Sequence, residues 1–311
     1  MKKFLMLSLT LVFALILAAC GKEESTSKSS SSSEQITIKH ELDETKVNKN
    51  PEKVVVFDFG ILDTLDHLGI EVAGVPQANI PSYLSKYEDS KYTNVGSLKE
   101  PDFEALANME PDLIIISARQ MEMYDELKKI APTIYLGVDS ARYMDSFKEN
   151  MEVVGKIFGK EKEVEDAIAK IEDDIKKLNE KASSLDKNAL IILANDGNIS
   201  AYGPKSRFGI IHDVFGVKPV DSNIEVSTHG QSISFEYIVE KNPDYIFVID
   251  RGAVVGGESS AKAALENKLI KETDAYKNGN IVYLTPDFWY LSGGGLISVQ
   301  EMVNEISNGL K

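Results

Sequence analysis

Two stretches of this chain, 132 residues apart, carry the same sequence pattern. The pattern is Phe-Glu, six further residues, Pro-Asp and an apolar run, and it begins at Phe103 and again at Phe235. A later offset of 148 relates the apolar runs at 134–136 and 282–284, so the second copy has gained 16 residues. We expect this gain near the glycine-rich loop at 252–261. A repeat of this kind predicts two similar folded units.

Each copy alternates short apolar runs with helical patterns. Runs of four apolar residues occur at 54–57, 113–116 and 190–193. Continuous runs of this length are typical of strands that are buried on both faces of a parallel sheet, with helices covering the sheet. We therefore predict an α/β fold with two similar lobes, at 36–142 and 188–311, each built on a parallel-type central sheet.

A charged helical region at 143–187 links the two lobes. One apolar stripe runs along it at steps of four and three, through Val164, Ile168, Ile171, Ile175 and Leu178. Gly159 is expected to interrupt the region, which leaves one long backbone helix at 160–183. Ligands of open parallel sheets bind beyond the carboxyl ends of the strands, so a ligand cleft is expected between the lobes. Because a helix does not bend as a loop does, the lobes should rock only slightly on binding.

The first 19 residues have the features of a signal peptide. Two lysines precede an apolar run that is shorter than the roughly 20 residues of a membrane-spanning helix. The run ends in Leu-Ala-Ala before Cys20, which resembles a bacterial lipobox and makes Cys20 the expected site of lipidation. Residues 20–35 are rich in serine and read as a flexible lipidated tether. We expect the mature protein on the outer face of the cytoplasmic membrane, held there by its lipid anchor alone.

Charge and composition exclude several classes of protein. A formal net charge of −15 makes nucleic acid an unsuitable partner. Because the chain has one cysteine, a disulfide framework, a zinc–cysteine cluster and an Fe–S protein are excluded. The four histidines are scattered without a pair at metal-ligand spacing, and no nucleophile elbow occurs. We therefore expect no metal site and no catalytic residues.

The arginines are the first candidates for ligand binding. The chain has 30 lysines and only four arginines, so each arginine departs from the prevailing bias. Arg119 and Arg251 follow equivalent strands of the repeat, and Arg207 lies in a turn before a helix expected at 208–215, whereas Arg142 reads as a surface residue. A guanidinium holds an oxyanion bidentately or stacks on a ring, so three at one cleft predict a pocket for a bulky polyanion. Interlobe salt bridges are the alternative.

Aromatic and polar side chains accompany these arginines. Tyr202 precedes Arg207, and Trp289 and Tyr290 precede a glycine-rich helix start. We expect Trp289, the only tryptophan, to line the cleft, with core packing as the alternative. Lys99 and His229 occupy polar loops that would face the same cleft, although a lone lysine and a loop histidine often have no such role.

Five segments of the sequence resemble a known family. They are GSLKEPDFE at 96–104, ISARQ at 116–120, GPKSR at 203–207, STHGQS at 227–232 and WYLSGGG at 289–295. Through them the chain resembles the helical-backbone (class III) substrate-binding lipoproteins of ABC importers for iron siderophores, haem and cobalamin. Within that family it is most similar to the petrobactin-binding lipoproteins of Gram-positive bacteria. The resemblance covers nearly the whole mature chain.

The resemblance implies a function and a set of site residues. It implies that Lys99, Arg119, Arg207 and Arg251 meet a preassembled ferric catecholate, with no cofactor of the protein's own. It also implies that Glu104 and Glu236 dock one lobe each on a membrane-embedded ABC permease, and a role at helix N-termini is the alternative. A monomer that is not an enzyme is expected. Haem, cobalamin or a hydroxamate siderophore is the alternative ligand, and an extracellular enzyme or an adhesin is the alternative class.

Overall fold

The computed structural model describes residues 34–258 and 260–311, and residues 34–311 form one compact unit. The signal peptide, Cys20 and nearly all of the tether lie outside the described residues. No helix in the described part of the chain is both long enough and apolar enough to cross a bilayer.

The N-terminal lobe is built on a five-stranded parallel sheet with the order β5-β4-β3-β6-β7. Its strands are β3 (Val54–Val56), β4 (Gly74–Val75), β5 (Thr93–Asn94), β6 (Leu113–Ile116) and β7 (Thr133–Tyr135). Its helical elements are α2 (Phe59–His67), η1 (Ser82–Glu88), α3 (Phe103–Met109), η2 (Ala118–Met123), α4 (Tyr124–Leu127) and η3 (Ser140–Arg142). An antiparallel hairpin of β1 (Gln35–His40) and β2 (Asp43–Asn48) packs beside β7.

The C-terminal lobe has a mixed sheet with the order β11-β9-β8-β12-β13, and β10 pairs with β8. Its strands are β8 (Asn188–Asn195), β9 (Asn198–Tyr202), β10 (Lys218–Pro219), β11 (Gln231–Ile233), β12 (Tyr245–Asp250) and β13 (Ile281–Leu284). Its helical elements are α7 (Ile210–Asp213), α8 (Phe235–Lys241), α9 (Gly252–Val255), α10 (Ala261–Leu265), η4 (Ile270–Glu272), α11 (Asp274–Lys277), the π-helix η5 (Asp287–Leu291) and α12 (Leu296–Gly309).

The two-lobe α/β prediction is confirmed, with one difference in the second sheet. β10, β8, β12 and β13 run parallel, but β9 and β11 are antiparallel to their neighbours. The reason is local: Asp196 and Gly197 join β8 to β9 and both have positive φ, at 49° and 81°. Two such residues make the tight turn that folds a chain back on itself as a hairpin. The helix expected at 208–215 is also shorter, since α7 covers only Ile210–Asp213.

The repeat in the sequence corresponds to a repeat in the structure. α3 and α8 have seven residues each and begin 132 positions apart, as do β6 and β12, whereas β7 and β13 begin 148 positions apart. Asp102 and Ser234 cap these equivalent helices through their side-chain oxygens. The extra residues of the second copy lie in the connection between β12 and β13, which contains α9, α10, η4 and α11.

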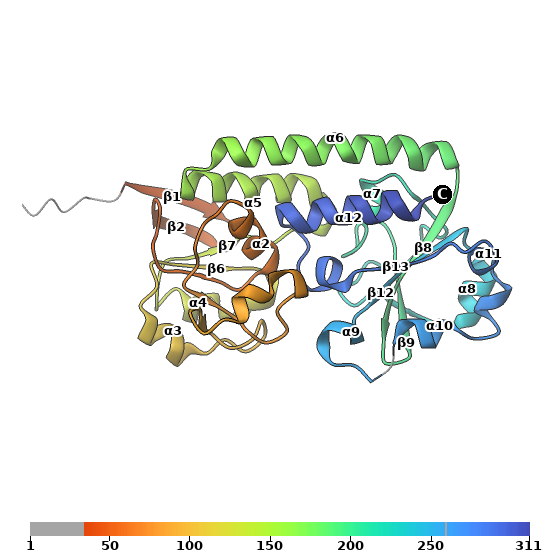
Figure 1. The fold of residues 1–311 in the computed structure, drawn as a ribbon, viewed down its shortest axis with the longest axis horizontal. Helices are drawn as coiled ribbons and strands as arrows, with labels where there is room; N and C mark the ends of the chain where they lie inside the picture. Colours follow the sequence, from red (N-terminus) through yellow and green to blue (C-terminus); the bar gives the residue numbers. More distant parts are fainter. Residues whose placement is uncertain (1–33, 259) are drawn as a thin grey trace, which may run out of the picture. The chain divides into compact units, whose positions relative to one another are not determined.

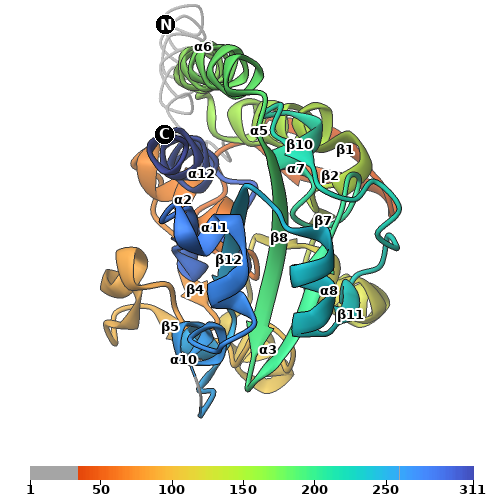
Figure 2. The same ribbon diagram turned by 90° about the vertical axis from the view of Figure 1, so that its right-hand side faces the viewer.

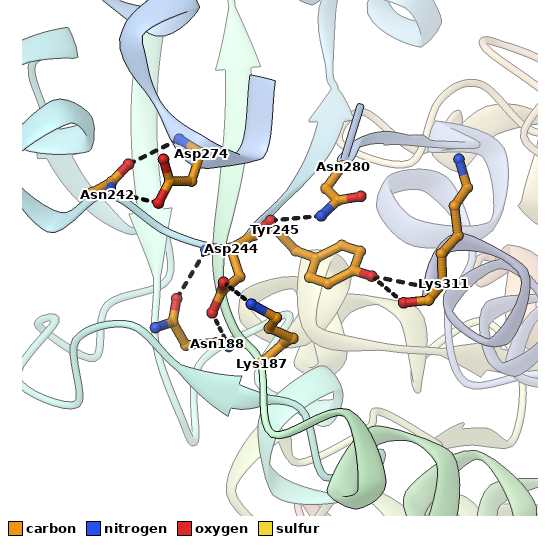
Figure 3. Close-up of polar contacts among 8 residues, drawn as sticks. All are labelled: Lys187, Asn188, Asn242, Asp244, Tyr245, Asp274, Asn280 and Lys311. Carbon is orange, nitrogen blue, oxygen red and sulfur yellow. Dashed lines mark hydrogen bonds and ion pairs between the residues drawn. The ribbon is translucent and has the colours of Figure 1, made fainter. Parts of the chain in front are cut away.

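The Pro-Asp pair of each copy ties neighbouring strands together. In the N-terminal lobe, Asp112 Oδ2 accepts hydrogen bonds from the backbone N–H groups of Glu52 and Lys53, directly before β3. In the C-terminal lobe, the equivalent Asp244 accepts from the backbone N–H of Asn188 at 3.0 Å and from Lys187 Nζ at 2.7 Å (Figure 3). Each aspartate therefore aligns the start of its own strand with the start of the central strand.

Two helices link the lobes, and a third helix packs on the second of them. They are α5 (Tyr143–Phe158) and α6 (Glu161–Leu185), and Gly159 ends α5 in the left-handed conformation with φ 62°. The observed α6 begins one residue later and ends two residues later than the helix expected at 160–183. α6 lies along both α5 and α12, as Figures 1 and 2 show. α12 in turn packs against α2, so the C-terminal helix also joins the two lobes.

The contact between α2 and α12 centres on a buried carboxylate. Asp63 on α2 is 1% exposed, and its oxygens accept from the backbone N–H groups of Ile297 at 3.2 Å and Ser298 at 3.1 Å, in the first turn of α12. The Tyr83 hydroxyl donates to Asp63 Oδ2 at 3.0 Å. A carboxylate at a helix N-terminus satisfies free N–H groups and complements the helix dipole. Gly295 is required here, because a Cβ atom would lie 2.1 Å from Asp63 Oδ1.

Replacing this carboxylate should change how stability depends on pH. Burial raises the pKa of Asp63 from 3.8 to about 7, and hydrogen bonds from Ser298, Ile297 and Tyr83 oppose that rise. Because the folded protein holds the proton more tightly than the unfolded chain, the stability from this group is present at low pH and is lost as pH rises from about 4 to about 7. The difference in unfolding free energy between wild type and Asp63→Asn should therefore shrink over this range, by at most on the order of 4 kcal/mol. Denaturant unfolding at several pH values measures it, and a difference that grows with pH would contradict the assignment.

Candidate functional site

Three arginines from different parts of the fold converge on Tyr290. Arg119 Nη2 and Arg207 Nη2 both donate to the backbone oxygen of Tyr290, at 3.0 and 2.6 Å. Arg251 Nε donates to the Tyr290 hydroxyl at 2.8 Å, and Arg251 Nη1 donates to Asn195 Oδ1 at 2.6 Å. The Arg207 guanidinium lies 4.4 Å from the centre of the Tyr290 ring, and that of Arg251 lies 5.6 Å away. One tyrosine therefore holds guanidinium groups from both lobes.

Local structure explains why each arginine reaches this point. Arg119 follows the carboxyl end of β6, and Arg251 follows the carboxyl end of the equivalent β12. Arg207 follows β9 in a tight turn, in which Ser206 Oγ donates to the Gly203 oxygen at 2.5 Å. Lys205 in the same turn has φ +60°, and its N–H donates to Asp213 Oδ2 at 2.6 Å, which offsets the strain of that conformation.

The cluster creates a region of positive potential. Burial and the neighbouring charge of Arg119 lower the pKa of Arg207, so the charged form is less favourable there than in water. Burial tends to raise the pKa of Tyr290, but the Arg251 hydrogen bond and the three guanidinium charges outweigh it, and the pKa falls below its usual value. The direction of the Tyr290 shift is the one expected where the local potential favours an anionic group.

A cavity of about 660 Å³ lies between the lobes beside this cluster, and we call it the main cavity. Both lobes contribute to its walls, with Arg119 from one lobe and Arg207 from the other. The walls also carry apolar and aromatic side chains, including Val138, Tyr143, Phe208, Trp289 and Met302. Cationic groups beside ring faces suit a ligand that is both anionic and aromatic.

The structure brings some of the expected residues to this cavity and leaves others away from it. Trp289 lines the main cavity although it is only 3% exposed, and its indole N–H donates to Glu305 Oε2 at 2.7 Å, so it also packs in the core. Tyr202 is wrong as a lining residue, because it is 1% exposed and packs its ring on Phe208 at 4.6 Å. His229 is exposed and lies next to Thr228, which does line the cavity.

Lys99 is exposed on a loop of the N-terminal lobe and is not part of the cavity wall. Arg142 is exposed and pairs with Glu149, as expected for a surface arginine. Glu104 and Glu236 are exposed, and each is the second residue of its helix, α3 or α8. The carboxylate of Glu236 is held by its own N–H and by Ser234, which lowers its pKa.

The wall of the main cavity also contains three residues that were not predicted from the sequence: Asp58, Lys205 and Tyr143. Asp58 caps α2 through a hydrogen bond from the Ile61 N–H at 2.9 Å; burial raises its pKa, and the Ser117 hydroxyl, the Ile61 N–H and the charge of Arg119 oppose that rise. The signal for Asp58 was present, because it follows the carboxyl end of β3 as Arg119 follows β6. Within residues 34–258 and 260–311, no group of three or more histidine, cysteine, aspartate or glutamate side chains could hold a metal ion.

The chain is similar to known siderophore-binding proteins in both sequence and structure. The chain is 58% identical to the petrobactin-binding protein YclQ of Bacillus subtilis, over the full length of both. The crystal structure of YclQ superposes with a TM-score of 0.87 at 60% identity, covering 89% of this chain and 99% of that one. The catecholate-siderophore-binding protein VctP of Vibrio cholerae superposes with a TM-score of 0.84 at 38% identity, covering 88% and 100%. The family described as periplasmic binding protein matches residues 54–288. The chain therefore belongs to the periplasmic binding protein family.

Proposed function

We propose that this protein captures a ferric catecholate siderophore of the petrobactin type outside the cytoplasmic membrane and delivers it to an ABC permease. The observation that carries the proposal is the convergence of Arg119, Arg207 and Arg251 beside the main cavity. Full-length similarity to a petrobactin-binding protein and structural similarity to a catecholate-siderophore-binding protein support it. These named relatives are binding proteins.

The chemistry of the site fits such a ligand. A ferric centre wrapped by catecholate and citrate oxygens carries about three negative charges, which guanidinium forks can hold through charge-assisted hydrogen bonds. Its catechol rings can lie against the aromatic wall of the cavity. Because the siderophore supplies the ligands of the iron, the protein needs only cationic groups and aromatic rings that contact the preassembled complex. Two of the expected residues, Lys99 and His229, do not line the cavity. In this proposal they contact the outer part of the bound complex.

The proposal also includes where the protein acts, at the outer surface of the cytoplasmic membrane. Signal peptidase would cleave before Cys20, and a lipid on that cysteine would hold the mature chain at the membrane surface by a serine-rich tether. A monomer suffices for this role, because both walls of the main cavity come from one chain.

Fluorescence of Trp289 tests the ligand directly. Since Trp289 lines the main cavity, ferric petrobactin should quench its emission, and Arg251→Ala should weaken binding by about 1.5–3 kcal/mol, with partial rescue by Arg251→Lys, which keeps the charge but loses the fork. Lys268→Ala, which changes an exposed lysine of the same lobe, is the matched control. A panel should include ferric hydroxamates, haem and cobalamin. If no ferric catecholate changes the emission, the proposed function is wrong.

Arg207→Met should separate binding from stability. Burial and Arg119 disfavour the charge of Arg207 in the folded protein, and Arg119 would still occupy the Tyr290 oxygen after the change. We expect the unfolding free energy of the ligand-free protein to rise by about 1 kcal/mol while siderophore affinity falls. Urea unfolding and fluorescence titration of the same sample measure the two effects. A fall in both quantities would mean that Arg207 serves the fold.

The glutamates of the repeat are proposed to dock the two lobes on the permease. Two exposed carboxylates at equivalent places, one on each lobe, would match a transporter made of two similar subunits. The double variant Glu104→Lys/Glu236→Lys should keep siderophore affinity and lose iron uptake by cells. Glu126→Lys/Glu272→Lys makes the same charge change at other exposed positions and should leave uptake intact. Normal uptake by the first variant, or loss of its ligand binding, would assign these glutamates to the fold.

A further inference from the structure

Neutral oxygens hold all three arginines of the cluster. Arg119 and Arg207 donate to the backbone oxygen of Tyr290, and Arg251 donates to the Tyr290 hydroxyl. The remaining acceptor is Asn195, whose Oδ1 accepts from Arg251 Nη1 at 2.6 Å. Asn195 has no role in the function described so far.

No carboxylate of the described residues takes part in these contacts, although carboxylates are common partners of a guanidinium. The chain has 49 acidic residues against 34 basic ones, so acidic partners are abundant. Within residues 34–258 and 260–311, the arginine that forms an ion pair is Arg142, with Glu149, and it lies outside the cluster. Asp58 is an acidic residue that feels the charge of Arg119, but burial raises its pKa and so favours its neutral form. The cluster therefore keeps its positive charge.

The backbone fixes Asn195 beside Arg251. Asn195 is the last residue of β8 and is paired with Asn198 of β9. The Arg251 N–H donates at 3.0 Å to the oxygen of Ala194, the residue before Asn195. Asn195 and Arg251 thus stand at the carboxyl ends of two neighbouring parallel strands, β8 and β12. Ligands of open parallel sheets bind at this end.

Two contacts orient the Arg251 guanidinium. Nη1 donates to Asn195, and Nε donates to the Tyr290 hydroxyl at 2.8 Å. These acceptors come from two different elements, β8 and η5, and together they fix the plane of the group. Without Asn195, Arg251 would keep its hydrogen bond to Tyr290 alone, and its side chain would regain rotational freedom.

An amide and a carboxylate at position 195 differ in charge and not in reach. Aspartate has the shape of asparagine and would accept from Arg251 Nη1 equally well. Its negative charge would pair with Arg251 and would lower the positive potential on which the binding of an anion depends. Asparagine orients the guanidinium without neutralising it.

We propose that Asn195 is a positioning residue for siderophore binding: its neutral oxygen orients Arg251 and leaves the charge of Arg251 uncompensated. Tyr290 holds Arg251 in one cluster with Arg119 and Arg207, so this charge adds to the positive potential at the cavity that Arg119 and Arg207 line. The inference rests on the proposed function and deepens it. It assigns part of the selectivity for an anionic ligand to a residue that does not itself line the main cavity.

Two substitutions of Asn195 separate its charge from its position. Titration of Trp289 fluorescence with ferric petrobactin measures the affinity. Asn195→Asp keeps the acceptor and adds a negative charge, so we expect binding at least about tenfold weaker than wild type at an ionic strength of about 0.05 M, and a smaller loss at about 0.5 M, where charges are screened. Asn195→Ala removes the acceptor and leaves the net charge unchanged, so we expect binding about threefold weaker at both ionic strengths.

The matched control is Asn278→Asp. It makes the same change at an exposed residue before β13, at the opposite end of the sheet, and should bind within about twofold of wild type. Thermal unfolding shows whether each variant is folded. The unfolding temperature of Asn195→Asp should not fall below that of wild type, because the new carboxylate pairs with Arg251.

The inference has distinct ways to fail. Wild-type affinity in Asn195→Asp would show that the neutrality of this residue has no role, and wild-type affinity in Asn195→Ala would show that it does not position Arg251. A loss in Asn195→Asp that is the same at both ionic strengths, or that comes with a lower unfolding temperature, would assign Asn195 to the fold. Failure of wild type to bind any ferric catecholate would instead refute the proposed function.

Discussion

The geometry of the arginine cluster depends on the contact between Asp63 and the first turn of α12. This contact joins an early helix of the N-terminal lobe to the last helix of the chain, and a Cβ atom at Gly60 or Gly295 would prevent the approach. Residues 292–295, just before α12, are held on the same side by Tyr83, which contacts Ser292 Oγ at 2.7 Å. Tyr290 lies two residues earlier, so the position of α12 determines where Arg119 and Arg207 find their shared acceptor.

The arginine cluster shows how a binding site can oppose stability. Guanidinium groups that gather near a cavity repel one another and lose hydration, and in the ligand-free protein Tyr290 compensates in part through its carbonyl, its ring and its hydroxyl. We expect the remaining repulsion among the guanidinium groups to favour the binding of an anion, because these groups are already in place before a ligand arrives.

Much of the fold was predictable because it repeats and because its strands are short apolar runs. The matching Phe-Glu and Pro-Asp positions predicted equivalent helices and strands, and the arginines stood out against a chain rich in lysine. The convergence of the arginines on Tyr290 was not predictable from the sequence. The hydrogen bonds to the Tyr290 oxygen come from Arg207, 83 residues away in the sequence, and from Arg119, 171 residues away. The contact between Asp63 and Ser298 spans 235 residues and has no local signature. The prediction that Tyr202 lies at the ligand site was wrong, because proximity to Arg207 in the sequence does not determine on which face of β9 a side chain lies.

The lobes are joined twice, through α6 and through the α2–α12 contact. This double connection affects how a transporter can distinguish the loaded protein from the empty one. A binding protein that closes around its ligand changes shape when the ligand binds. A transporter can then discriminate against the ligand-free form by its shape. With both connections in place, we expect the outer faces of the two lobes to keep nearly the same spacing with or without cargo. Unfilled copies would therefore compete with filled ones for the same transporter, and the ratio of receptor to transporter in the membrane would set the rate of import when the siderophore is scarce.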